Sequence, residues 1–334
     1  MYPSAIDLSP PLRFVDDVTP VLLDWRRAGL AGVLVTLVGI EGASPRPLGS
    51  QMAVNERGDW VGQISSDCAE AAIAREAIAS LADRRSRSVR YGRGSKYLDV
   101  RLPCGSGLDI HFDPCVPFDV LEALETGRRA RRPVALISPW HAEGEATPAH
   151  CIEEIGRDGP RSDLELVVDT TSFARRYWPQ TRVVVAGRGA YAASLVSFVH
   201  ALGWEACLLT PDVALIEQHA HHCRLTGKLS SARDFDAALI DPWTATVLLF
   251  HDHTWEPDIL AHALKAGGFY VGALGSRATH SRRLDELAKF GVSAAQARRI
   301  HGPVGLDVGA RTPPEIALSI AGEIVAARRT VSRR

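Results

Sequence analysis

A glycine-rich turn between a strand and a helix constrains the fold more than any other feature of this sequence. The apolar run Arg182–Ala186 is followed by the pattern G-x-G-x-x-A at Gly187–Ala192, and apolar residues then recur at helical spacing. In such a turn the first glycine permits a tight bend, the second lets a phosphate approach the backbone, and the third small residue packs helix on strand. Unpaired N–H groups at the helix start favour an anion. We therefore expect Gly187, Gly189 and Ala192 to cradle a phosphate.

The rest of the second half repeats the alternation of strand and helix. Apolar runs at Ala206–Leu209, Thr246–Phe250 and Phe269–Leu274 are typical of strands, and a helix is expected near Pro257–Ala266. Strands linked by helices predict a parallel sheet with right-handed connections. A capping box with two prolines, Thr312–Glu315, predicts where the last helix begins.

The first half has a different pattern. Ala31–Ile40 is typical of a buried strand, and Gln51–Asn55 and Trp60–Ser65 flank a turn, which predicts a hairpin. Asp67 and Glu70 are spaced as the capping box of a following helix. This half is therefore expected to be α+β.

The fold class predicted is α/β: a C-terminal Rossmann-like parallel-sheet domain preceded by an N-terminal α+β domain. With 334 residues the chain is long enough for two domains. We expect an N-terminal domain over residues 1–127, a connecting hairpin and linker region over 128–180, and the Rossmann-like domain over 181–334.

The composition of the chain limits the kinds of partner that it is expected to bind. Lys plus Arg (38) nearly balance Asp plus Glu (39), so no overall charge draws the chain to nucleic acid or to an anionic membrane. No apolar run approaches the roughly 20 residues of a transmembrane helix, and the N-terminus does not resemble a signal peptide. The six cysteines form no Cys-x-x-Cys pair. We expect a cytoplasmic protein.

Two further segments follow strands and could line the same site. Gly275, Ser276 and Arg277 combine a flexible turn, a hydroxyl and a guanidinium, which suit an oxyanion. His251 and His253 follow another strand and could contact a ligand or serve a structural purpose.

The acidic residue that reads the ribose of NAD is missing from its usual place. Thr210 stands at the end of the second strand, where an Asp or Glu is expected. Asp212 could substitute for it or could cap the next helix. This weighs against a standard NAD enzyme.

Cysteine and histidine offer other chemistry. Cys68 is expected at the first position of its helix, where the dipole favours a thiolate, and Cys104 lies in a glycine-rich turn. Each could hold sulfur or contact a soft metal centre, or could fill a tight space. His219, His222 and Cys223 would share a helix face with zinc-like spacing, His221 lying beside them, but a polar face is the preferred interpretation, and no metal site is predicted.

Taken together, these segments resemble the XdhC/CoxI family of molybdenum hydroxylase maturation factors. The resemblance covers nearly the whole chain. The segments that carry it in the first half are Gly42–Met52, Gly62–Glu70 and Cys104-Gly105, and those in the second half are Gly187–Ala192, His251–His253, Tyr270–Arg277 and Ile300–Ile320. The chain departs from the family pattern at Ser66 and Asp67, which stand where members carry two glycines.

The resemblance implies a chaperone rather than a catalyst. It implies binding and protection of molybdenum cofactor (molybdopterin) and delivery to the apo-enzyme of a xanthine dehydrogenase or CO dehydrogenase type hydroxylase, with a cysteine desulfurase as a further partner. A homo-oligomer is compatible with this interpretation. Two alternatives stay open: an NAD(P)-dependent oxidoreductase, and an assembly module that docks the hydroxylase without binding cofactor.

Overall fold

The computed structural model describes residues 17–95, 105–141, 150–156, 166–250 and 255–331. The described residues divide into two compact units, one drawn from Phe14–Arg157 and Asp163–Pro179 and the other from Gln180–Arg334. Each unit has hydrophobic clusters of its own. The units are therefore considered separately.

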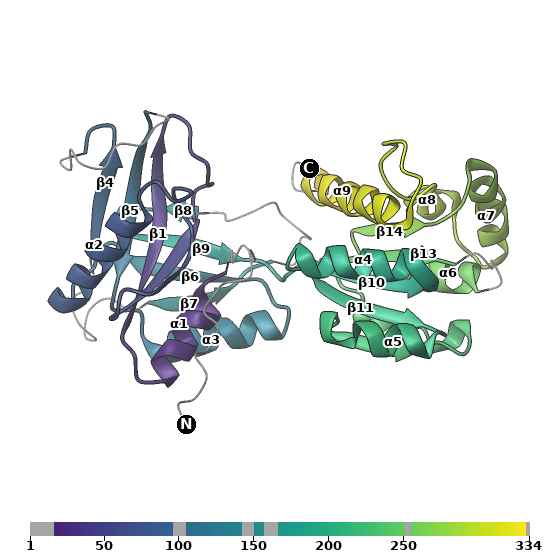
Figure 1. Cartoon of the computed structure of the whole chain (residues 1–334), viewed down its shortest axis with the longest axis horizontal. Coiled ribbons are helices and arrows are strands. Elements are labelled where there is room, and N and C mark those ends of the chain that lie inside the picture. The colour runs from purple at the N-terminus through teal and green to yellow at the C-terminus, as the bar shows by residue number, and fades with distance from the viewer. Residues whose placement is uncertain (1–16, 96–104, 142–149, 157–165, 251–254, 332–334) are drawn as a thin grey trace, which may run out of the picture. The chain divides into compact units, whose positions relative to one another are not determined.

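The first unit contains an antiparallel sheet covered by a helix. Among the described residues this sheet has five strands in the order β3-β2-β1-β5-β4 (Figure 1). The strands are β1 (Gly32–Glu41), β2 (Gln51–Asn55), β3 (Trp60–Gly62), β4 (Arg87–Gly92) and β5 (Gly107–Asp113), and the helix is α2 (Glu70–Asp83). Ile73 and Ala77 of α2 are fully buried against Val35 and Met52 of the sheet. The predicted strand and hairpin are thus present.

A second antiparallel sheet belongs to the same unit. Within the described residues its order is β7-β6-β9-β8. Its strands are β6 (Val134–Pro139), β7 (Cys151–Glu154), β8 (Leu166–Val168) and β9 (Ser172–Tyr177), and the accompanying helices are α1 (Thr19–Arg27) and α3 (Phe118–Arg129). The Tyr177 hydroxyl donates to Gln51 Oε1 at 2.9 Å, which joins β9 to β2.

The second unit is built on a parallel sheet. Over the described residues it has six strands, all parallel, in the order β12-β11-β10-β13-β14-β15. They are β10 (Arg182–Gly187), β11 (Glu205–Thr210), β12 (Leu225–Lys228), β13 (Thr244–Leu249), β14 (Tyr270–Ala273) and β15 (Ile300–His301). The sequence predicted four of these strands and missed β12 and β15.

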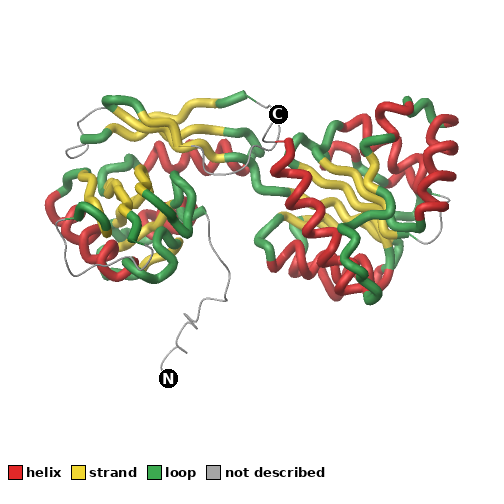
Figure 2. Tube along the Cα trace, turned by 90° about the horizontal axis from the view of Figure 1, so that it is seen from above, coloured by secondary structure: helices red, strands yellow, loops and turns green. Residues whose placement is uncertain are grey.

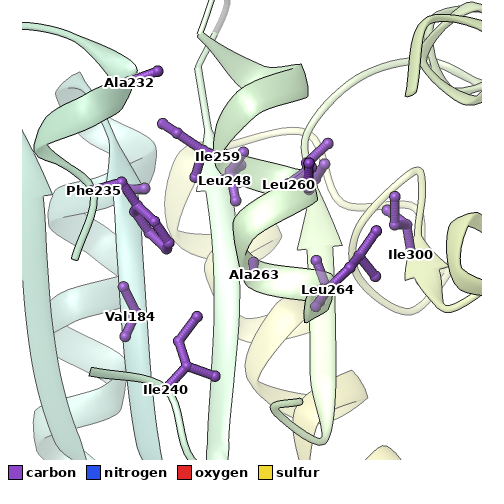
Figure 3. Close-up of a cluster of buried hydrophobic side chains, with 14 of the residues drawn as sticks. Val184, Ala232, Phe235, Ile240, Leu248, Ile259, Leu260, Ala263, Leu264 and Ile300 are labelled. Atoms are coloured by element: carbon purple, nitrogen blue, oxygen red, sulfur yellow. The ribbon is translucent and has the colours of Figure 1, made fainter. Parts of the chain in front are cut away.

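Helices cover both faces of the parallel sheet (Figure 2). They are α4 (Gly189–Ala201), α5 (Val213–His219), α6 (Glu256–Ala266), α7 (Arg277–Lys289), α8 (Ala294–Ala297) and α9 (Pro313–Val331). Helices α4 and α9 pack on one face through Leu195, Val199 and Ile324. Helix α6 packs on the other face, where Ile259 lies beside Leu248 of the sheet, and Leu264 belongs to the same buried cluster (Figure 3).

Two details of the predicted helices need correction. Asp67 and Glu70 do not form a capping box, because α2 begins at Glu70 and its N-cap, Ala69, has no side-chain cap. Cys68 therefore precedes the helix and does not occupy its first position. Helix α9 agrees better with its prediction, since Glu315 accepts from the backbone N–H of Thr312 at 2.9 Å.

Candidate functional site

The order of the parallel sheet marks one place on the second unit. The chain runs from β10 outward through β11 to β12, and then returns to the other side of β10 for β13, β14 and β15. Ligands of such sheets bind outside the carboxyl ends of the strands, where the order reverses. That place is the carboxyl end of β10 and β13. The turn Gly187–Ala192 leaves β10 at this point.

The two glycines of this turn differ in the space that a side chain would have at each position. A Cβ at Gly187 would lie 2.6 Å from Leu249 Cβ and 2.7 Å from Leu249 O, so β10 and β13 approach too closely for a side chain. Gly189 has a φ of 61°, and a Cβ there would meet nothing within 4 Å. A Cβ at Gly189 would therefore have room among the described residues, and the positive φ is the local reason for glycine at this position.

The start of α4 presents backbone rather than side-chain groups. Its N-cap, Arg188, makes no side-chain cap, and the first turn has no acidic residue. Arg188, Gly189 and Ala190 are exposed, whereas Ala192 is fully buried in the core. The first N–H groups of a helix have no partner within it, and the helix dipole makes this end positive. Such an end can hold a phosphate.

Arg188 extends the turn toward the next connection. Its guanidinium carbon lies 5.7 Å from the centre of the Trp255 ring, at the start of α6. At this distance the ring face attracts the cation, which favours one orientation of the Arg188 side chain. Trp255 was not singled out from the sequence, because a lone tryptophan before a helix is typical of ordinary core.

The second predicted turn follows β14. Gly275 has a φ of 143°, and Ser276 is the N-cap of α7, its hydroxyl accepting from the N–H of Thr279 at 3.1 Å. Ser276 and Arg277 are exposed. The hydroxyl oxygen of Ser276 is thus already engaged in capping α7, whereas the Arg277 side chain is exposed.

A buried ion pair between Arg283 and Glu256 stabilises the backbone that leads into this second turn. Arg283 of α7 and Glu256 of α6 are each 2% exposed, with 3.2 Å between Nη2 and Oε2. The same Nη2 donates to the carbonyl of Leu274 at 2.6 Å. Leu274 precedes Gly275, so the pair fixes the backbone that leads into the turn. The sequence contains no local pattern that pairs Arg283 with Glu256, because the two residues are 27 positions apart.

A second network lies at the end of β15. Glu323 of α9 accepts from the hydroxyl of Tyr270, from the N–H of Gly305 at 2.8 Å, and from His301 Nδ1 at 3.0 Å. Burial raises the pKa of Glu323, but the bonds from His301, Tyr270 and Gly305 outweigh it and hold that pKa below its ordinary value. The His301 ring stacks on Tyr270, with 4.4 Å between ring centres. The carboxylate is therefore ionised and fully engaged.

The end of β11 does not provide a ribose-binding acid. The Thr210 side chain is fully buried, and its hydroxyl accepts from the N–H of Asp212 at 3.1 Å. Asp212 itself caps α5, accepting from the N–H groups of Ala214 and Leu215. Asp212 could have bound a ribose or capped the next helix, and in the structure it caps the helix.

In the first unit, Cys68 is exposed in a tightly held loop. Ser66 and Asp67, which precede it, have positive φ values of 56° and 71°. Glu70 is buried and accepts from the N–H groups of Ile64 and Ser65 at 3.0 and 2.7 Å. The backbone thus keeps the conformation that two glycines would adopt, although neither residue is glycine.

Several predicted residues lie outside the described part of the chain. These are Cys104, His251 and His253. Gly105 and Phe250, beside them, are described: Gly105 has a φ of 65°, and Phe250 is buried. The roles predicted for Cys104 and the two histidines stay predictions.

The histidines near the end of α5 do not share a helix face as predicted. The helix ends at His219, His221 and His222 lie in a 3-10 turn, and His200 of α4 joins them with 4.5 Å between its ring centre and that of His222. Burial, with the neighbouring rings, lowers the pKa of His222. Among the described residues no group of three or more His, Cys, Asp or Glu side chains is arranged to hold a metal ion.

The sequence also did not predict a buried contact in the first unit between a histidine, His150, and an aspartate, Asp113. His150 Nε2 lies 2.6 Å from Asp113 Oδ2, and both side chains are 2% exposed. Burial lowers the pKa of the nearby His111 to about 4. The charges of His150 and His141 also lower this pKa, whereas the charge of Asp113 raises it. These residues join β5 to the second sheet of the unit, which is a structural role.

Comparisons with known proteins decide the family. A family model described as the XdhC Rossmann domain matches residues 183–324, and one described as the XdhC and CoxI family matches residues 25–92. The molybdenum cofactor insertion chaperone PaoD of Escherichia coli K12 is 33% identical over 301 residues, which are 90% of this chain and 85% of PaoD. The chain belongs to the XdhC and CoxI family.

More distant relatives cover the chain as fully. A probable xanthine dehydrogenase subunit of Bacillus subtilis 168 is 23% identical over 336 residues, with 90% of this chain and 94% of that protein covered. A crystal structure of a xanthine dehydrogenase from Bacillus halodurans has a TM-score of 0.76 at 20% identity, covering 93% of this chain and 96% of that one. The predicted fold class is confirmed.

No helix in the described ranges has the length and hydropathy needed to cross a membrane.

Proposed function

We propose that this XdhC and CoxI family member binds molybdenum cofactor and delivers it to a molybdenum hydroxylase. The names of its relatives, a cofactor insertion chaperone and a probable subunit of xanthine dehydrogenase, support a role in the maturation of molybdenum enzymes. The cofactor is cargo in this proposal. The chain's own residues bind it, shield it and release it.

The observation that carries the proposal is the open start of α4. Molybdopterin ends in a phosphate, and the exposed backbone of Gly189 and Ala190 suits that group in size, charge and accessibility. No acidic side chain in the first turn of α4 opposes the anion. Gly187, Gly189 and Ala192 form the cradle, and Arg188 adds a positive charge beside it.

The other predicted residues complete the proposed grip. Gly275, Ser276 and Arg277 would contact the polar body of the cofactor from the end of β14, because Arg277 is exposed there and the turn is rigidly supported by Arg283. His251 and His253 follow β13, between these two turns in the strand order. Cys104 or Cys68 would approach the molybdenum or its sulfur ligand.

A nicotinamide dinucleotide is less well supported. Thr210 is buried and Asp212 caps α5, so neither of these residues offers a free carboxylate to a ribose. An assembly module that binds the hydroxylase without cofactor is the remaining rival. A cysteine desulfurase and a second copy of the chain are proposed partners, with the hydroxylase apo-enzyme as recipient.

The test is co-purification of the cofactor. The full chain is isolated from a host that makes molybdenum cofactor, and the oxidised pterin released from it is measured by fluorescence. We expect wild-type protein to carry pterin and Gly189→Asp to lose at least about tenfold, because the carboxylate would occupy the cradle and repel the phosphate. Gly203→Asp is the matched control, since Gly203 also has positive φ (71°) and open space, but follows the other end of α4.

Two results would count against the proposal. Wild-type protein without pterin, but able to capture the hydroxylase, would favour the assembly module. Equal loading of the Gly189→Asp and Gly203→Asp variants would show that the cofactor is held elsewhere.

A further inference from the structure

Arg188 and Trp255 meet at the carboxyl end of the parallel sheet, in the second unit. Arg188 is the N-cap of α4, which follows β10, and Trp255 is the N-cap of α6, which follows β13. The guanidinium carbon of Arg188 lies over the face of the Trp255 ring, 5.7 Å from its centre. Strands β10 and β13 are the neighbours between which the strand order reverses, so the contact lies where ligands of such sheets bind.

Arg188 is directed toward α6 by the extended backbone at the end of β10. Ala186 packs in the same buried cluster as Ile259 of α6. Arg188 follows Ala186 by two residues and is itself extended, and residues two apart in an extended segment point to the same face. Its side chain therefore lies on the face of the sheet that α6 covers, whereas α4 packs on the opposite face.

The Trp255 ring is held by the core of the unit. It makes a T-shaped contact with the ring of Phe250, which is buried, and 5.9 Å separate the two ring centres. The next residue, Glu256, is buried and paired with Arg283. Trp255 thus has a fixed orientation, whereas Arg188 is an exposed side chain that can change its rotamer.

The gap between Arg188 and Trp255 is wider than that of a closed stack. In the first unit, the Arg175 guanidinium carbon lies 3.7 Å from the centre of the Tyr177 ring, in direct contact. At Trp255 the corresponding distance is 5.7 Å. A flat ring in contact with both groups needs about 7 Å between them, because stacked carbon atoms lie roughly 3.5 Å apart. An outward movement of Arg188 by roughly 1–2 Å would therefore admit such a ring.

The two side chains suit a flat polar heterocycle. Indole faces and guanidinium planes both stack on the bases of nucleic acids, and a guanidinium also donates hydrogen bonds to ring oxygens and nitrogens. Arg188 directly precedes Gly189, so a ring held over Trp255 would adjoin a phosphate held at the start of α4. The pterin of molybdenum cofactor is a heterocycle of this kind, and the same molecule carries the phosphate.

We infer that Trp255 and Arg188 hold the pterin ring of the cofactor between them, with Trp255 as the fixed surface and Arg188 as the movable cover. This inference rests on the proposed function and names the residues that bind the ring rather than the phosphate. Binding moves Arg188 outward from Trp255 and onto the opposite face of the ring. Phe250 and Glu256 act as positioning residues for Trp255.

Free pterin tests this contact, because it has the ring without the phosphate. Its binding to the full chain, purified from a host that makes no molybdenum cofactor, is measured by equilibrium dialysis. Wild-type protein is expected to bind pterin, and Trp255→Leu to bind it at least about fivefold more weakly, because the stacking surface is lost. Trp255→Phe should keep most of the affinity, since it keeps an aromatic face. Arg188→Ala is expected to bind pterin about two- to fivefold more weakly.

Two control variants are matched to these changes. Trp204→Leu removes a half-buried tryptophan of the same unit that follows the other end of α4, and Arg224→Ala removes an exposed arginine just before β12, at the amino edge of the sheet. Both are expected to bind pterin like wild type. Thermal unfolding of every variant identifies any that loses affinity because it does not fold. If Trp255→Leu does not fold, Trp255→Phe and Arg188→Ala, which change less of the core, carry the test.

The inference is overturned if wild-type protein does not bind pterin, or if folded Trp255→Leu binds it as tightly as wild type or as Trp204→Leu. Unchanged binding by Arg188→Ala rejects the cover. Failure of the proposed function gives a different pattern: free pterin then binds through Trp255, but the chain carries no cofactor from the producing host. Cofactor that co-purifies and depends on Gly189, with equal loading of Trp255→Leu, rejects the ring contact alone.

Discussion

Ser66 and Asp67 hold backbone conformations that glycine adopts without strain. Their φ values are 56° and 71°, and both side chains are exposed, so little packing compensates for the strain. Left-handed conformations cost a residue with a Cβ roughly 1–2 kcal/mol. The family resemblance puts glycines at these two positions, and the backbone agrees with that although the side chains differ.

Ser66→Gly is therefore expected to stabilise the protein. The gain in unfolding free energy should be about 0.5–1 kcal/mol, because relief of strain exceeds the added freedom of the unfolded chain. Chemical denaturation measures it, with Ser66→Ala as the control that keeps a Cβ. Equal stability of the two variants would mean that the positive φ is not maintained in solution.

Glu70 makes the stability of this loop depend on pH. Burial raises the pKa of Glu70, but bonds from the Ser65 hydroxyl and from the N–H groups of Ser65 and Ile64 lower it more, so the net shift is downward from 4.5. A carboxyl whose pKa is lower in the folded state stabilises that state above the unfolded pKa, and this contribution is lost as pH falls.

The wild-type unfolding free energy should thus decline below about pH 4.5, and Glu70→Gln should decline less. At pH 7 the same variant should be less stable by roughly 2–3 kcal/mol, because its amide N–H₂ faces backbone donors. Denaturation curves from about pH 3 to pH 7 test both points. Parallel pH profiles for wild type and variant would contradict the assignment.

At the scale of elements, the β10–α4 turn contains two glycines that are required for different reasons, lack of space at Gly187 and a positive φ at Gly189. Gly187→Ala is expected to cost roughly 2–4 kcal/mol of unfolding free energy, since its Cβ would meet Leu249 backbone and side-chain atoms. Gly189→Ala should cost only about 1 kcal/mol, because the new Cβ meets open space and only the positive φ is strained. Urea unfolding compares them; equal costs would mean that β13 yields to the added methyl group.

The same turn shows what a sequence can predict about elements. Strands β1, β10, β11, β13 and β14 were found because each is an apolar run ended by glycine, proline or a polar turn. Strands β12 and β15 were missed because Leu225–Lys228 and Ile300–His301 are short and have no run or alternation of apolar residues. Only pairing with a neighbour makes them strands.

The candidate site follows the same rule. The glycine pattern predicted the turn between β10 and α4, because the geometry of that turn is local to one short segment, Gly187–Ala192; that the turn holds a phosphate stays a proposal. The supporting groups could not be found in this way: Glu256 and Arg283 are 27 residues apart, and His301 and Glu323 are 22 residues apart. Their charges meet only through the packing of α6 on α7 and of α9 on the sheet.

At the scale of the whole molecule, the two units should unfold separately. Each has its own cores, and Glu70 and Gly187 lie in different units. In calorimetry Glu70→Gln should lower one transition and Gly187→Ala the other. If each variant lowers both transitions equally, the chain is one cooperative unit.

The central claim is that the start of α4 holds the phosphate of the cofactor. A crystal structure of the full chain isolated with its cofactor tests this most directly. Phosphate oxygens are expected about 2.7–3.2 Å from the backbone nitrogens of Gly189 and Ala190. A phosphate bound elsewhere, with protein side chains filling the space before Gly189, would contradict it.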